Sequence, residues 1–271
     1  MSNDTCAAKA YTKALAKSPT SYNLAGALGI ELTKIQEHDR AILTFQNFFS
    51  HEDGESIHKQ HYAYSLSQKD YIDDATEWFY KSIQTDAKNF EAAEALVNHL
   101  VKAENYTEAL AVIGHYNMIF PKQTMRQWED LRAEVTEAYD KFTSQYEIKE
   151  IKISGINKFL FAPAKFRAGS ETQLFLVDPE SEFLTVDKNQ LSAMGADYKD
   201  LGEKEVMATN GKYLKGNQII LSELQVGPFT LKNVKAMACE NCAFLLGKDV
   251  MKKLNSKAQD NKGIKYITLK Q

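Results

Sequence analysis

Histidine placement limits the chemistry that this sequence of 271 residues can perform. Every histidine lies in the first half of the chain: His38, His51, His58, His61, His99 and His115. The part after residue 146 therefore cannot by itself host a Ser-His-Asp triad, a Cys-His pair or a histidine-ligated metal. Chemistry there must use carboxylates, lysines or thiols. In the first half, His58 and His61 could share a helix face, but no carboxylate or thiol at ligand spacing completes a set, so we predict no metal site.

Thiols form one short motif in the second half, Cys239-Glu240-Asn241-Cys242. Three interpretations stay open: two reduced, partly buried thiols, a local disulfide or redox pair, or a zinc site completed by a second copy of the chain. Reduced thiols are favoured, because no βαβ context surrounds the motif. The sequence has no glycine-rich phosphate loop and no Gly-x-Ser-x-Gly elbow, so we expect no nucleotide or other cofactor.

Composition and charge exclude several classes of protein. A net charge of -3 and a pI near 6.1 argue against a general nucleic-acid binder, and no apolar run reaches bilayer length. No leader segment follows Met1, so the expected location is cytoplasmic, or periplasmic if a leader was removed. Residues 1–146 carry 14 Lys+Arg and 21 Asp+Glu, whereas residues 147–271 carry 19 and 15. We therefore divide the chain into two domains with these bounds.

A period of 34 residues organises the first domain. It relates Ala41, Ala75 and Ala109; Phe45, Phe79 and Ile113; Leu32, Leu66 and Leu100; and Leu28, Tyr62 and Leu96. Within each period the apolar residues step at helical intervals, and a short break separates two helices. Each period therefore predicts a helical hairpin whose small residues let helices approach closely.

This pattern resembles the tetratricopeptide repeat (TPR), a family of helical hairpins that stack into an α-solenoid. The resemblance implies a final capping helix over about residues 124–146 and a concave, peptide-binding face on the first helix of each hairpin. That face would carry Asn23, Lys34, Gln60, Tyr64, Gln68, Asn98 and Lys102, with Ile30 and Glu94 beside them. Gly26 and Ile30 stand where relatives that clamp a terminal carboxylate have Lys and Asn, so we expect a more general protein or peptide partner.

The second domain changes to a strand-like period. Apolar residues alternate or cluster over 147–153, 158–161, 173–177 and 218–221, and a short helix is predicted over 247–254. Asn210-Gly211 is the strongest hairpin signal, because a type I′ turn needs positive φ at both central residues. The sequence therefore predicts a mostly β domain and an α+β protein overall.

The order of these segments resembles the retropepsin-like aspartic protease domain. The matching pieces are Phe175-Leu176-Val177-Asp178, Leu191-Ser192-Ala193-Met194-Gly195, Ala208-Thr209-Asn210-Gly211, Val226-Gly227, Asn233-Val234 and Leu245-Leu246-Gly247. The resemblance implies that Asp178 would be the catalytic residue, that Asn210 and Gly211 would form the tip of a flap over the substrate, and that activity would need a homodimer.

The implied catalytic loop departs from the family pattern. Where the family has Asp-Thr-Gly, this chain has Asp178-Pro179-Glu180. Pro179 supplies neither a hydroxyl nor a backbone N–H, and Glu180 adds a carboxylate beside the one that must share a proton across the dimer. We therefore predict a protein-interaction scaffold with an inactive, pseudoprotease domain that serves as a dimerisation or peptide-binding module. The alternative is a homodimeric aspartic endopeptidase whose repeats recruit substrate.

Overall fold

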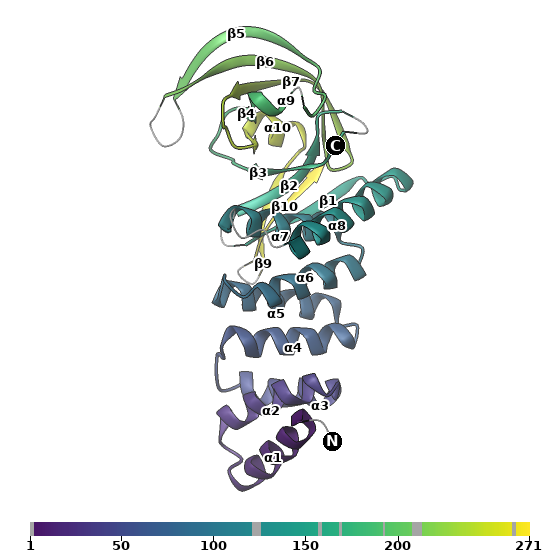
Figure 1. Cartoon of the computed structure of the whole chain (residues 1–271), viewed down its shortest axis with the longest axis vertical. Coiled ribbons are helices and arrows are strands. Elements are labelled where there is room, and N and C mark those ends of the chain that lie inside the picture. Colours follow the sequence, from purple (N-terminus) through teal and green to yellow (C-terminus); the bar gives the residue numbers. More distant parts are fainter. Residues whose placement is uncertain are drawn as a thin grey trace. The chain divides into compact units, whose positions relative to one another are not determined.

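A computed structural model describes residues 3–120, 126–156, 159–167, 170–191, 193–207, 213–261 and 264–271 (Figure 1). The chain divides into two compact units, Met1–Glu104 and Asn105–Gln271, and each is described by itself below. The first is helical and the second contains all the described strands. None of the described helices is both long and apolar enough to cross a membrane.

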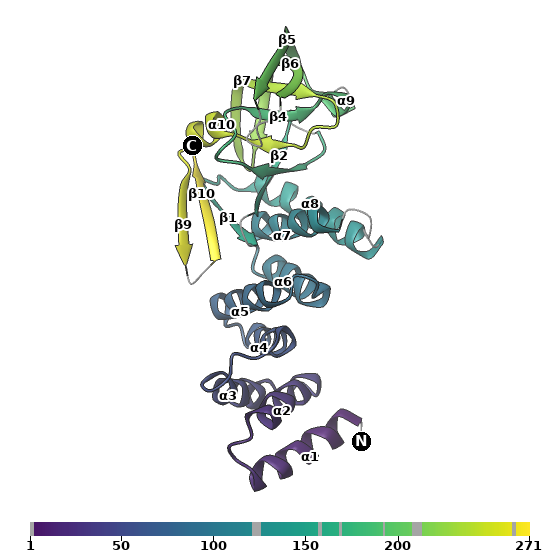
Figure 2. The same cartoon turned by 90° about the vertical axis from the view of Figure 1, so that its left-hand side faces the viewer.

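Helices account for the secondary structure described in the first unit (Figure 2). They are α1 (Asn3–Lys17), α2 (Tyr22–Lys34), α3 (His38–Phe49), α4 (Ser56–Gln68), α5 (Ile72–Thr85) and α6 (Phe90–Lys102). The first residues of α2, α4 and α6 are 34 positions apart, as are those of α3 and α5. The helical period predicted from the sequence is therefore confirmed in the positions of the elements.

Packing explains why the period is kept. Ala41 and Ala75 are fully buried, and so are the rings of Phe45 and Phe79 four residues later. Gly29 leaves room for the first of these rings, since a Cβ there would lie 2.7 Å from a Phe45 ring carbon. A small residue on one helix and an aromatic residue on the next thus fill a shared space.

The described part of the second unit holds two long helices, two short ones and a sheet. The helices are α7 (Tyr106–Ile119), α8 (Arg126–Gln145), α9 (Lys188–Leu191) and α10 (Lys248–Lys253). The strands are β1 (Glu150–Ile156), β2 (Phe159–Lys165), β3 (Gln173–Val177), β4 (Leu184–Asp187), β5 (Tyr198–Met207), β6 (Tyr213–Val226), β7 (Phe229–Cys239), β8 (Leu245–Leu246), β9 (Lys257–Asn261) and β10 (Ile264–Lys270). Their order across the sheet is β5-β6-β7-β4-β8-β3-β2-β1-β10-β9. The strand-rich second half is therefore confirmed.

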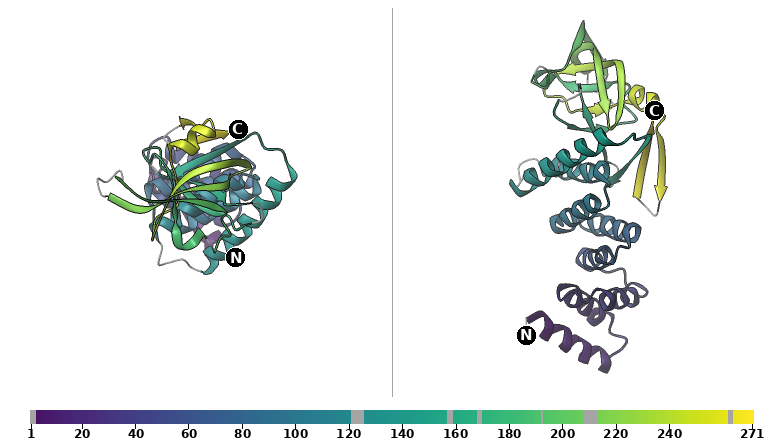
Figure 3. Two further views of the ribbon diagram at one scale, coloured as in Figure 1. Left: turned by 90° about the horizontal axis from the view of Figure 1, so that it is seen from above. Right: turned by 90° about the vertical axis from the view of Figure 1, so that its right-hand side faces the viewer.

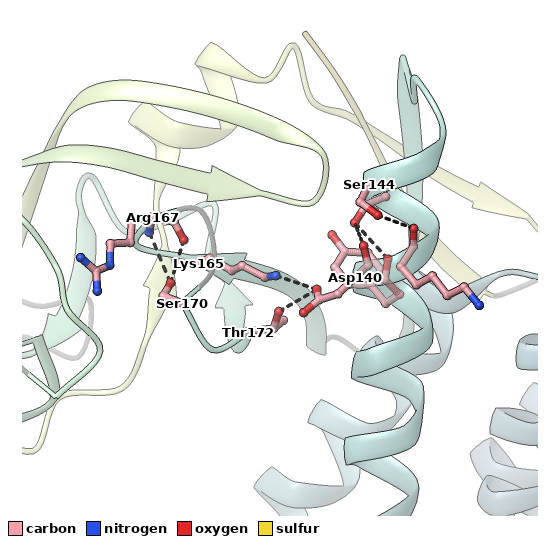
Figure 4. A network of polar contacts seen from close by, with 9 residues as sticks. Asp140, Ser144, Lys165, Arg167, Ser170 and Thr172 are labelled. Carbon is pink, nitrogen blue, oxygen red and sulfur yellow. Dashed lines mark hydrogen bonds and ion pairs between the residues drawn. The ribbon is translucent and has the colours of Figure 1, made fainter.

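Helices α7 and α8 belong to the second unit, so its boundary differs from the predicted domain boundary between residues 146 and 147. Helix α7 packs against β1, β2 and β3, and Gly114 lies so close to Phe161 that an added Cβ would be 2.6 Å from the ring. Figure 4 shows Asp140 of α8 between Lys165 and Thr172, at 2.7 and 3.2 Å. Helix α7 thus covers the apolar surface of the sheet, and α8 packs against α7 and reaches Lys165 and Thr172 through Asp140.

Strands β5 and β6 form a long, arched hairpin (Figures 1 and 3). They pair antiparallel as far as Met207 and Tyr213, which agrees with the hairpin that the sequence predicts. The predicted turn residues themselves, Asn210 and Gly211, lie outside the described residues. The predicted strand 218–221 is the central part of the longer β6.

Candidate functional site

The site around Asp178 is built on a strand that is inserted between two others. Strand β8 pairs in parallel with β3, through Leu176 with Leu245 and Val177 with Leu246. On its other side it pairs antiparallel with β4, through Leu245 and Thr185. Because β3 and β4 are consecutive in the chain, the loop that joins them, residues 178–183, must cross the end of β8.

Backbone hydrogen bonds hold this crossing loop in place. Asp178 N donates to Leu246 O at 3.0 Å, and Lys248 N donates to Ser181 O at 2.8 Å. Gly247 is required at the crossing, since a Cβ there would lie 2.4 Å from Phe183 O. The apolar-apolar-glycine motif seen in the sequence is therefore the segment that passes beneath the loop.

The carboxylate of Asp178 is oriented by its own loop. Its Oδ1 accepts hydrogen bonds from the backbone N–H groups of Glu180, at 3.0 Å, and Ser181, at 3.3 Å. The residue is half-buried, whereas Pro179 and Glu180 are exposed. Among the described residues, Oδ2 accepts no hydrogen bond, and no second carboxylate contacts Asp178. An acid–base pair at this position would need its second member from another chain.

The arched hairpin lies near the crossing loop. Lys204 of β5 places its Nζ 5.5 Å from the ring centroid of Phe183, the last residue of the loop. A hollow of about 450 Å³ is lined by β5, β6 and β7, among them Lys204, Asn217 and Cys239. The hairpin thus reaches the loop through Lys204, whereas the hollow has no lining residue from the loop.

The structure joins Cys239 and Cys242 in a disulfide. This corrects the preference for reduced thiols and selects the second of the three interpretations. The physical reason is the turn after β7, in which Asn241 adopts φ 55° and brings the two Cα atoms to 5.5 Å. Asn is one of the few residues that accept this left-handed conformation readily, so a strand ending in Cys-x-Asn-Cys was the signal available in the sequence.

The predicted binding face of the first unit contains two adjacent hollows. Lys34, Gln60 and Tyr64 line one of about 320 Å³. The second, of about 360 Å³, is lined by Tyr64, Gln68, Asn98 and Lys102 together with Glu94. Asn23 is exposed on α2 and lines neither hollow. The structure therefore brings six of the predicted residues to one face, from α2, α4 and α6.

Electrostatics in these hollows depend on local partners. Glu31 accepts a hydrogen bond from Lys34 at 2.8 Å and raises the pKa of this lysine. Burial lowers the pKa of His61 to about 4, so its imidazole is neutral at physiological pH. His61 and Glu91 line the hollows but were missed as binding residues, although His61 lies three positions before Tyr64, one helical turn away. The described residues contain no group of three or more His, Cys, Asp or Glu suited to a metal ion.

Comparison with solved structures finds 22 similar chains, among them one retropepsin-like protease. No protein-family model matches the chain, and no curated protein matches it. The crystal structure of a retropepsin-like aspartic protease from Rickettsia conorii is similar over 45% of this chain and 92% of that chain, with 19% identity and a TM-score of 0.34. At this TM-score the neighbour by itself establishes neither fold nor function.

Proposed function

We propose that this chain is a protein-interaction scaffold, in which TPR-like helical hairpins bind a protein or peptide partner and a retropepsin-like domain serves as a dimerisation or peptide-binding module without cleaving peptides. Three features of the second unit support the retropepsin-like part. Asp178 follows β3, Leu245-Leu246-Gly247 lies between β3 and β4, and the β5–β6 hairpin approaches the loop at Phe183. These are the segments whose order in the sequence resembles that family.

The observation that carries the absence of cleavage is the exposed Glu180 beside Asp178. Aspartic protease chemistry needs two aspartates that share one proton, so that one acts as base on a water molecule and the other as acid. A symmetric dimer that brought two copies of Asp178 within hydrogen-bonding distance would also bring two copies of Glu180 to the same place. Four carboxylates repel one another, and Pro179 offers no hydroxyl to tie the two loops together.

One observation favours the alternative, a homodimeric aspartic endopeptidase. The loop holds the Asp178 carboxylate through two backbone N–H groups and leaves Oδ2 without a hydrogen bond among the described residues. A carboxylate held in this way has a defined orientation and one oxygen available to a water molecule.

Cleavage of an unfolded protein mixture between about pH 4 and pH 7 distinguishes the two proposals. The proteins to compare are the wild type, Asp178→Asn, and the double variant Pro179→Thr/Glu180→Gly, which restores the family pattern. We expect no cleavage by the wild type or by Asp178→Asn. Cleavage by the wild type that disappears in Asp178→Asn, with the fold retained, would establish the endopeptidase. Activity gained in the double variant would show that Pro179 and Glu180 prevent cleavage. Sedimentation of the same samples tests for the dimer.

A further inference from the structure

We propose that the face formed by α2, α4 and α6 binds an extended peptide segment that places a lysine or arginine side chain beside Glu91 and Glu94 and passes over Tyr64. This inference rests on the proposed protein-binding function and names the chemistry of the partner.

Tyr64 is the centre of this face. It lines both hollows, as does Ala95 of α6, which has no side chain beyond Cβ. Tyr64 is 43% exposed, so its ring is accessible to a partner. Aromatic rings offer much contact area at a low cost in conformational entropy, because they have few rotatable bonds. We therefore assign Tyr64 as the anchor on which a partner packs.

The size of the hollows favours an extended partner. Each of them, at about 320 and 360 Å³, lies at the lower end of the range of roughly 300–1,000 Å³ found for small-ligand pockets. Such a hollow holds one or two side chains but not a helix. Two hollows on either side of one ring suit two side chains of a single extended segment.

Amide side chains beside the Tyr64 ring can form hydrogen bonds with the backbone of a bound peptide. Gln60, Gln68 and Asn98 carry both donors and acceptors, as a peptide group does. Asn89 Nδ2 donates to Gln60 Oε1 at 2.9 Å, which fixes the orientation of the Gln60 amide. The amide nitrogen of Gln60 donates no hydrogen bond among the described residues. A backbone carbonyl of the partner is a suitable acceptor for it.

The charge of the face decides which side chain is bound. Lys34 is paired with Glu31 at 2.8 Å, and Lys102 with Asp70 at 2.9 Å, so both lysines already have a counter-charge. His61 contributes no positive charge, since its imidazole is neutral at pH 7. Glu91 and Glu94 line the second hollow, and Glu91 forms no ion pair among the described residues. This balance favours a cationic side chain.

The net charge around this face also favours a basic partner. The first unit, residues 1–104, carries 10 basic and 15 acidic side chains. An acidic surface increases the rate at which a basic segment associates and disfavours acidic ones. The partner chemistry is therefore a basic, extended segment of a protein, and a free carboxyl terminus is not required for it.

A selection from a random heptapeptide library tests this inference with the full-length chain. The wild type is compared with Glu91→Gln/Glu94→Gln and with a matched control, Asp73→Asn/Asp74→Asn, which removes the same charge from the exposed start of α5. We expect the wild type and the control to enrich peptides with Arg or Lys at one fixed position, and the Glu91/Glu94 variant not to enrich them. Circular dichroism checks that all three are folded.

Affinity measurements on the most strongly enriched peptide then isolate the contribution of its positive charge to binding. Replacing an arginine of this peptide by citrulline, or a lysine by norleucine, removes the charge with little change of shape. This change is expected to weaken binding about tenfold or more to the wild type and hardly at all to Glu91→Gln/Glu94→Gln. Tyr64→Ala is expected to abolish binding of both peptides. Selection without basic enrichment, no selected peptide, or equal binding to the wild type and the Glu91/Glu94 variant overturns the inference. None of these outcomes bears on cleavage at Asp178, so the two proposals fail separately.

Discussion

Helices and sheet in this protein are packed through different kinds of contact, and the glycines show the difference. In the first unit, Gly29 makes room for a side chain, the ring of Phe45. In the second unit, Gly247 makes room for backbone, since an added Cβ would lie 2.4 Å from Phe183 O. A side chain can be shortened by a second substitution, whereas a backbone crossing cannot. A packing fault at Gly29 should therefore be repairable by a second substitution, and one at Gly247 should not.

The largest expected effect is that of Gly247→Ala. The new methyl group collides with the loop that crosses β8, and we expect the second unit to lose about 3 kcal/mol or more of its free energy of unfolding. Each unit contains one of the two tryptophans, Trp78 in the first and Trp128 in the second. Urea denaturation of Trp78→Phe and Trp128→Phe variants therefore reports on each unit separately.

The matched change in the first unit is Gly29→Ala. Its destabilisation should be largely reversed by a second substitution, Phe45→Leu, which trims the ring that the new Cβ meets. No equivalent partner exists for Gly247, because the colliding atoms are the carbonyl groups of Phe183 and Ser181. If Phe45→Leu failed to compensate Gly29→Ala, the comparison between the units would be wrong.

Two buried histidines, His99 and His115, extend the comparison between the two units. In the first unit, His99 bonds to Ser67 Oγ through Nδ1 at 2.7 Å and contacts Thr76 Oγ1 through Nε2 at 3.1 Å. In the second unit, His115 is also buried, but its ring nitrogens have no hydrogen-bond partner among the described residues. We expect His99→Leu to cost about 2 kcal/mol at pH 7, because buried hydroxyls lose their partner, and His115→Leu to be neutral or stabilising. Denaturant titration measures both, and an equal loss in the two variants would contradict the assignment.

Acid should destabilise the second unit through His115. Burial lowers the pKa of His115 to about 4 in the folded chain, whereas in an unfolded chain it is about 6.5. The unfolded state then binds more protons between these pH values, so stability falls as the pH drops from about 6.5 to 4, by about 3 kcal/mol from this residue. His115→Leu should flatten that part of the stability profile measured at the Trp128 probe. An unchanged slope would show that another group is responsible.

The smallest effect concerns two helix ends with the same hydrogen-bond pattern. After α2, Gln36 N donates to Thr33 O and Glu37 N to Leu32 O; after α10, Asn255 N donates to Lys252 O and Ser256 N to Met251 O. Gln36 and Asn255 both have positive φ, 62° and 43°. Glycine adopts this conformation without strain, and Asn tolerates it better than Gln does. We expect Gln36→Gly to stabilise the first unit by about 0.5–1 kcal/mol and Asn255→Gly to stabilise the second by less. Thermal unfolding compares them, and a larger gain at Asn255 would contradict this account.

The difference between the helical and the strand-rich part also explains which structural features could be predicted from the sequence. The 34-residue period gave the helix pairs and the buried positions correctly, because each repeat packs against residues close to it in sequence. The shared face of α2, α4 and α6 followed from the same period, which put Lys34, Gln60 and Lys102 on one side. In the second half, strand-like spacing predicted β1, the start of β2, β3 and part of β6, and Asn210-Gly211 predicted the hairpin between β5 and β6. The residue types of the loop Asp178-Pro179-Glu180, and the chemistry that they allow, could also be taken from the sequence.

Other features could not be derived from the sequence, since they depend on segments that are distant in the chain. Leu245 pairs with Leu176, about seventy positions away, and with Thr185, about sixty positions away. The apolar character of Leu245 and Leu246 does not specify these partners. Helices α7 and α8 belong to the second unit because α7 packs against the sheet and α8 packs against α7, although both helices continue the helical half of the sequence. The two hollows beside Tyr64 likewise exist only once three helices are packed.

For this protein, the sequence by itself determined the helical repeat, the change to strands and the residue types available for chemistry, because these follow from local periodicity and side-chain identity. Only the tertiary structure decided that Cys239 and Cys242 are joined, that the loop of Asp178 crosses β8, and that Glu91 and Glu94 share a hollow with Tyr64. The physical reason is that a site consists of distances between side chains, and those distances are set by the packing of elements that are far apart in the chain.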